Sequence, residues 1–136
     1  MTSAPGLFST AEVFNFFGWK KVMQNFLLIS FGAILGANLR YWVGAWAGQK
    51  FGSGFPLGTL LINVIGSFLI GLFMTLATEK LLLDPRWRLF FAVGFLGAFT
   101  TFSTFTYESI TLLMSGEWIN GLLNLFGSLL LGIVAV

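Results

Sequence analysis

Polar side chains recur at regular spacing inside stretches of the chain that are otherwise apolar. Thr59, Asn63 and Ser67 follow one another at intervals of four residues, which places them on one face of a helix. Asn124 and Ser128 repeat that interval near the end of the sequence. Amides and hydroxyls buried in lipid either hydrogen-bond to a neighbouring helix or line a water-filled path, because an unpaired polar group is costly there. Spacing alone leaves both interpretations open.

The densest polar cluster runs from Gly97 to Phe105 and reads Gly-Ala-Phe-Thr-Thr-Phe-Ser-Thr-Phe. Hydroxyl side chains compete for backbone hydrogen bonds and glycine weakens a helix, so this segment predicts a break. Irregular backbone at membrane depth is tolerated only where protein or water covers it, and its free carbonyls can bind a small cation. The alternative is an intact helix whose Ser and Thr side chains bond back to carbonyls.

Phe102 and Phe105 are three residues apart and share a face of a helix. Packing is the default interpretation of either ring, but the edge of a phenyl ring is positive. Two such edges beside Asn63 and hydroxyl donors could hold a small anion without a full positive charge, and conduction requires weak binding at several sites. Arg40 and Glu108 are the other charges inside apolar stretches. Each either reaches to a membrane interface or lies on an ion path.

The overall composition excludes most other classes of protein. Of the 136 residues, 57% are hydrophobic and only 9% are charged, far below the quarter typical of soluble domains. The sequence holds no His and no Cys, so the usual parts of acid–base, metal and thiolate catalysis are missing, and we do not expect an enzyme. A net charge of +2 is too small and scattered for a nucleic-acid partner.

A helix needs about 20 predominantly apolar residues to cross a bilayer. Segments of sufficient length and apolarity lie at about 26–48, 57–78, 87–114 and 118–136. The connections between them are short, and tryptophans fall near their ends, where interfacial aromatic residues belong: Trp42, Trp46, Trp87 and Trp118. We therefore predict an all-α membrane protein with four transmembrane helices, formed by residues 25–136 and embedded in the lipid bilayer of a cell membrane.

Residues 1–24 form an extension that differs from the rest of the chain. Thr10-Ala11-Glu12 followed by several aromatic residues and then Lys20-Lys21 predicts a short interfacial helix, with disorder as the alternative. Positive charge is concentrated on the side of the membrane that holds the N-terminus: Lys20, Lys21, Lys80, Arg86 and Arg88, against Lys50 in the loop on the other side. The positive-inside rule therefore favours a cytoplasmic N-terminus.

Three motifs in this order and spacing resemble one family of membrane proteins. The segment 97–105 is similar to the G-G-x-T-T-F-S-T-F signature of the Fluc (CrcB-type) fluoride channels, with Ala98 in place of the second glycine. Residues 58–63 resemble the family's G-T-x-x-x-N motif, and residues 36–41 resemble its G-x-x-x-R-[YW] pattern. The resemblance covers the chain from about Phe26 to its C-terminus.

The resemblance implies a subunit of four helices with a broken third helix, assembled as an antiparallel, dual-topology dimer. Fluoride pores run along the dimer interface in that family, and a sodium ion at the centre is held by backbone carbonyls of the break. By position, Gly97 and Thr100 would supply the sodium carbonyls, and Arg40 would lie in a vestibule. The residues that would form the fluoride pore are Asn63, Phe102, Ser103, Thr104, Phe105, Asn124 and Ser128.

The resemblance implies a passive, selective fluoride export channel that lowers cytoplasmic fluoride. The charge bias fits one orientation better than a balanced dual topology, so the dimer is either a homodimer or a heterodimer with a homologous subunit of opposite orientation. The alternative function is a small multidrug-type proton antiporter, which needs a carboxylate deep in an early span. The first two spans have none, and Glu108 lies beyond the predicted break. A structural membrane subunit, without ion flux, is a third possibility.

Overall fold

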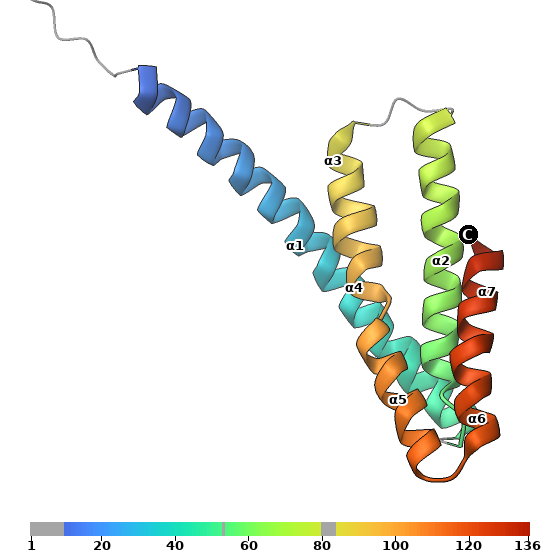
Figure 1. Ribbon diagram of the computed structural model, residues 1–136. Helices are drawn as coiled ribbons and strands as arrows, with labels where there is room; N and C mark the ends of the chain where they lie inside the picture. Colours follow the sequence, from blue (N-terminus) through green and yellow to red (C-terminus); the bar gives the residue numbers. More distant parts are fainter. Residues whose placement is uncertain (1–9, 53, 80–83) are drawn as a thin grey trace, which may run out of the picture.

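The structure is a computed structural model that describes residues 10–52, 54–79 and 84–136 (Figure 1). All regular secondary structure in those ranges is helical. Four stretches are long and apolar enough to cross a membrane: Gly18–Phe51, Leu57–Ala77, Pro85–Met114 and Trp118–Ala135. The predicted number of spans is therefore confirmed, and the chain is a multi-pass membrane protein.

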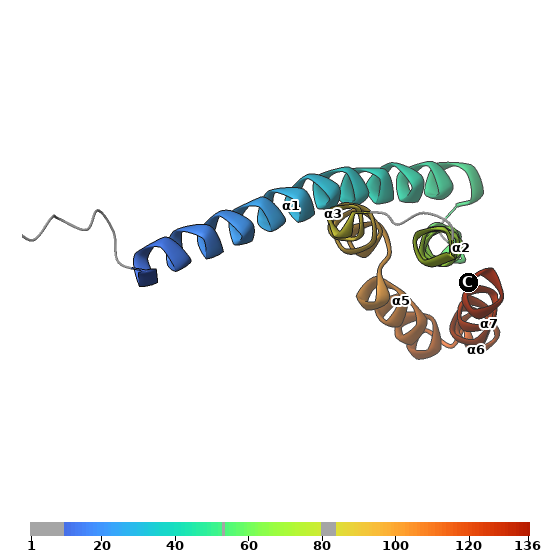
Figure 2. The ribbon, with the colours of Figure 1, turned by 90° about the horizontal axis from the view of Figure 1, so that it is seen from above.

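The first helix is longer than expected. α1 (Thr10–Phe51) is one continuous helix of 42 residues, whereas the sequence predicted a span that begins near Phe26 and a separate short helix before it. No proline interrupts this stretch, so nothing in the sequence ends the helix before the span begins. At 1.5 Å per residue α1 is about 63 Å long, roughly twice the hydrocarbon thickness of a bilayer. Its N-terminal half extends away from the other helices (Figures 1 and 2). Contact of residues 10–24 with the membrane surface stays a prediction, and residues 1–9 lie outside the described ranges.

Close approach of backbones joins α1 to the third span. A Cβ atom on Gly32 would overlap the Phe90 carbonyl oxygen, and one on Gly36 would overlap the Phe95 carbonyl oxygen. From the other side, a Cβ on Gly94 would lie 2.6 Å from the carbonyl oxygen of Ile29. Small residues permit this approach in membrane helices, where tight backbone packing replaces the hydrophobic effect as the driving force.

The second and third spans carry the polar residues of interest. α2 (Leu57–Glu79) is an uninterrupted helix. The third span consists of α3 (Pro85–Trp87), a π-helical segment η1 (Arg88–Leu96), α4 (Gly97–Phe99) and α5 (Phe102–Met114), in that order. Thr100 and Thr101 separate α4 from α5, and the axis of α5 is displaced from that of the first half (Figures 1 and 2). The predicted break in the third span is confirmed.

The fourth span follows after a tight turn. Gly116 has a φ of +87°, and the N–H of Glu117 donates to the Leu112 carbonyl while that of Gly116 donates to the Leu113 carbonyl. These two hydrogen bonds form a Schellman motif, which ends α5 and needs glycine at its left-handed position. The chain continues through α6 (Trp118–Leu122), a π-helical segment η2 (Leu123–Gly127) and α7 (Ser128–Ala135).

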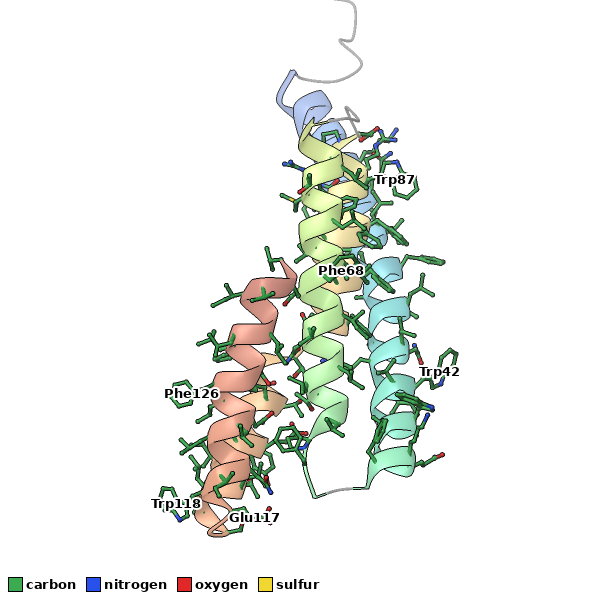
Figure 3. The ribbon with its side chains drawn as sticks, turned by 90° about the vertical axis from the view of Figure 1, so that its right-hand side faces the viewer. Trp42, Phe68, Trp87, Glu117, Trp118 and Phe126 are labelled. Carbon is green, nitrogen blue, oxygen red and sulfur yellow. The ribbon has the colours of Figure 1, made fainter. Side chains whose placement is uncertain are left out.

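The single chain buries few of its apolar side chains. Ala47, Ile62, Leu96 and Phe99 are the buried hydrophobic residues of the described ranges, and most large apolar side chains are exposed. Trp87 and Trp118 lie at opposite ends of the bundle, while Phe126 points outward from the fourth span (Figure 3). An exterior of this kind belongs in lipid or against another protein rather than in water.

Candidate ion pathway at the helix break

The break itself is two residues of extended backbone. Thr100 has ψ of 159°, and Thr101 has φ of −148° and ψ of 116°. The Thr101 hydroxyl caps α5 by accepting a hydrogen bond from the Thr104 N–H at 3.3 Å. The Thr100 hydroxyl donates to the Leu96 carbonyl at 3.0 Å. Back-bonding by hydroxyls therefore occurs together with the break, although the sequence presented the two as alternatives.

Asn63 on α2 holds the break with both ends of its amide. Its Nδ2 donates to the Thr101 carbonyl at 3.0 Å, and its Oδ1 accepts from the Thr101 N–H at 2.9 Å. The Asn63 amide therefore makes the same two hydrogen bonds to the Thr101 backbone that a peptide group of another chain segment would make. One of the two N–H bonds on Nδ2 is used in this pair, so the second is available for another acceptor.

The hydrogen bonds between Asn63 and Thr101 leave a backbone carbonyl of α4 without its helical donor. In a continuous helix the N–H of Thr101 would donate to the carbonyl of Gly97, four residues earlier. Here that N–H donates to Asn63 instead, which releases the Gly97 carbonyl. The neighbouring Thr100 is held by α2, because its side chain packs so closely on Gly66 that a Cβ there would overlap it.

Two cavities meet at the break. The first, of about 490 Å³, lies between α2, the third span and the fourth span, and its lining includes Asn63, Ser67, Gly97, Phe102, Phe105 and Ser128. The second, of about 570 Å³, lies toward the loop that joins α1 to α2, and its lining includes Arg40, Thr59, Thr104, Tyr107 and Glu108. Thr101 lines both cavities. The break therefore borders both cavities.

The two predicted pore phenylalanines lie side by side at this point. The ring centroids of Phe102 and Phe105 are 5.9 Å apart with an angle of 47° between the planes. Phe105 is half-buried, whereas 77% of Phe102 is exposed on the single chain. Ser103 and Thr104 are also exposed; Thr104 lines the second cavity, and Ser103 lines neither of the two.

The predicted polar residues of the fourth span differ in their access to the first cavity. Ser128 lines this cavity, whereas Asn124 does not and is fully buried where the fourth span packs on α5. Asn124 Nδ2 donates to Ser109 Oγ at 2.9 Å, and its Oδ1 accepts from Ser128 Oγ at 3.3 Å. Ser109, which donates onward to the Phe105 carbonyl at 2.8 Å, was not singled out from the sequence.

Arg40 and Glu108 both line the second cavity. The Arg40 guanidinium donates to the Thr100 carbonyl, with Nη1 at 3.4 Å from the oxygen. Thr59 Oγ1 donates to Glu108 Oε1 at 2.9 Å, while Glu108 Oε2 is buried without a hydrogen-bond partner. The hydrogen bond between Thr59 and Glu108 was not predicted from the sequence. The spacing of polar residues placed Thr59 on the same face of α2 as Asn63 but gave no partner for it.

Comparison with known proteins identifies the family. Residues 27–136 match the family model described as CrcB-like protein, Camphor Resistance (CrcB). The chain belongs to the CrcB family. The extension at residues 1–24 lies outside the part that matches the CrcB model.

Several relatives in the CrcB family are named "Fluoride-specific ion channel FluC". The relative from Chloroflexus aurantiacus is 49% identical over 114 residues, which cover 84% of this chain and 90% of the relative. A relative from Thermus thermophilus is 50% identical over 111 residues, covering 82% of this chain and 88% of the relative. The relative from Oceanobacillus iheyensis is 46% identical over 111 residues, covering 82% and 84% respectively.

Proposed function

We propose that this protein is a passive, selective fluoride channel that exports fluoride from the cytoplasm across the cell membrane. The observation that carries the proposal is the interrupted third span, where Thr101 lines two cavities and is hydrogen-bonded to the Asn63 amide, which lines the first of them. The similarity to relatives named as fluoride-specific channels supports the same ion.

Fluoride would exchange its water for weak dipolar contacts along this path. The second N–H of Asn63 is available for an anion, and Phe102 and Phe105, whose ring edges are positive, line the same cavity. Ser128 contributes a hydroxyl to the first cavity, Thr104 contributes one to the second, and Arg40 adds positive charge to the second as a vestibule would. Contacts of this kind bind an anion weakly enough to let it leave.

A second subunit would complete the path. Gly97, Ser103 and Thr104 are exposed on the single chain, although they lie in the middle of a membrane-spanning segment. Lipid cannot satisfy polar groups at such a depth, so another protein surface or water must cover them. An antiparallel dimer, with either an identical chain or a homologous chain of opposite orientation, would place the exposed Phe102 of each subunit against the other.

Sodium is the cofactor that this proposal includes. The carbonyls of Gly97 and Thr100 fit it, because hard cations prefer oxygen ligands and discontinuous membrane helices bind Na⁺ through such carbonyls. The Gly97 carbonyl has lost its helical donor, and the Thr100 carbonyl accepts a single long hydrogen bond from Arg40, which leaves a lone pair. One chain offers two carbonyls, so the dimer would supply four. The ion would add positive potential at the centre of the dimer.

A proton antiporter is less well supported. No carboxylate occurs between Gly18 and Ala77, which covers the first two spans, and Glu108 is paired with Thr59 at one end of the path. The relatives are named as channels and not as antiporters.

The proposal is tested by fluoride efflux from liposomes that contain the purified protein, measured with a fluoride electrode. Chloride-loaded liposomes, read with a chloride electrode, are the control. We expect rapid fluoride efflux and chloride efflux no faster than from protein-free liposomes. A protein that releases neither ion, or both at similar rates, would not be a fluoride channel.

A further inference from the structure

We propose that Asn63 is a positioning residue for the sodium site, in addition to any contact it makes with fluoride. In this view its Oδ1 creates the site by diverting the N–H of Thr101 away from the Gly97 carbonyl. The inference rests on the proposed function, because sodium belongs to that proposal.

The argument begins with the acceptor half of the amide. A carbonyl in the middle of a helix already accepts a hydrogen bond, so its oxygen is a poor cation ligand. At the end of α4 the Thr101 N–H lies 2.9 Å from Asn63 Oδ1, which takes the place of the Gly97 oxygen. Without an acceptor on α2, that N–H would be unsatisfied inside the membrane unless the helix closed over the break. Asn63 thus removes the main cost of leaving the Gly97 carbonyl free.

The donor half keeps the second carbonyl in place. Asn63 Nδ2 donates to the Thr101 carbonyl at 3.0 Å, so both polar groups of Thr101 are tied to α2. With Thr101 fixed in an extended conformation and the Thr100 side chain packed on Gly66, the peptide between them cannot turn back into the helix. The Thr100 carbonyl is therefore held outside the helical hydrogen-bond pattern.

Two substitutions separate these halves. Asn63→Asp retains an oxygen that accepts the Thr101 N–H, but an ionised carboxylate has no donor and repels an anion. Asn63→Leu keeps the same number of side-chain heavy atoms with the same branching, and it removes both donor and acceptor. Asn124→Leu is the matched control, because it removes a fully buried asparagine that bonds Ser109 and Ser128 instead of the break.

The measurement is the thermal unfolding midpoint of the purified protein in detergent, in sodium chloride and in N-methyl-D-glucamine chloride at equal ionic strength. An ion that binds only the folded state raises the midpoint. We expect sodium to raise the midpoints of the wild-type protein and Asn124→Leu by similar amounts and to have no effect on Asn63→Leu. The shift of Asn63→Asp is expected to be smaller than that of the wild type but present, because the acceptor for the Thr101 N–H is kept and the donor to the Thr101 carbonyl is lost. A residue that only stabilises the fold would lower all midpoints and leave the sodium shift unchanged.

A sodium shift in Asn63→Leu equal to that of the wild type would overturn the inference. If Asn63→Leu does not fold, Asn63→Asp decides, since loss of its sodium shift would also overturn it. Absence of any shift in the wild type would reject the sodium site itself. Fluoride efflux is measured separately, so the channel proposal is tested independently of these sodium-dependent midpoints.

Discussion

Asn124 and Ser109 join the fourth span to α5, with Asn124 Nδ2 at 2.9 Å from Ser109 Oγ and both residues fully buried. Ser109 bonds onward to the carbonyl of Phe105, and Asn124 accepts from Ser128. These hydrogen bonds connect the fourth span to the backbone of Phe105, one of the two predicted pore phenylalanines.

Asn124→Ala is expected to lower the free energy of unfolding by about 1–2 kcal/mol, because it leaves a cavity and removes partners from Ser109 and Ser128. A double-mutant cycle with Ser109→Ala, followed by thermal unfolding in detergent, measures the coupling between the two side chains. Strictly additive effects of the two substitutions would show that the hydrogen bond contributes nothing to stability.

Asn63→Asp is expected to abolish fluoride conduction. An ionised carboxylate repels the anion and has no N–H to donate, and position 63 lines the first cavity beside the break. Fluoride efflux from liposomes at equal protein density measures the effect, and size-exclusion chromatography checks that the variant keeps the wild-type assembly. Fluoride efflux from Asn63→Asp at the wild-type rate would show that Asn63 does not lie on the fluoride path.

Phe102→Ile is expected to slow fluoride efflux roughly tenfold, the factor produced by about 1.4 kcal/mol of lost stabilisation along the path. The substitution keeps an apolar side chain and removes the positive ring edge. Phe126→Ile is the matched control, because Phe126 is 60% exposed, points outward and lines neither cavity (Figure 3). Equal fluoride efflux rates for both variants and the wild type would show that Phe102 only packs and does not stabilise fluoride along the path.

Gly36→Ala is expected to destabilise the fold by about 1–3 kcal/mol, because the added methyl overlaps the Phe95 carbonyl and pushes α1 away from the third span. Gly48→Ala on the same helix is the control, since nothing lies within 4 Å of a Cβ at that position. The unfolding midpoints of the two variants are compared in detergent. If the two midpoints fall together, close backbone packing at Gly36 is not what holds α1 in place.

Much of the fold could be predicted from hydropathy and local chemistry. The second span, predicted at 57–78, is the helix Leu57–Glu79, and hydroxyls after Gly97 correctly predicted the break. The start of α1 could not be predicted in this way, because hydropathy reports where a chain enters lipid and not where a helix begins. Thr10 begins a helix that continues into the first span without interruption.

The partners of the polar residues could not be predicted either. Spacing placed Thr59 and Asn63 on one face of α2, but their hydrogen bonds to Glu108 and Thr101 depend on how far α2 is shifted along the third span. The same holds for Asn124, whose spacing from Ser128 is regular but whose main partner, Ser109, lies on a different span. Contacts between helices arise from tertiary packing, which no periodicity within one helix specifies.

The central claim is that fluoride moves passively and carries charge through this protein. The most direct measurement is fluoride efflux from potassium-fluoride-loaded liposomes with and without valinomycin, which supplies a path for the compensating potassium. The account predicts fast efflux that starts only when valinomycin is added and that does not depend on an imposed proton gradient. Efflux that proceeds at full rate without valinomycin and follows the proton gradient would contradict a channel and indicate proton-coupled transport instead.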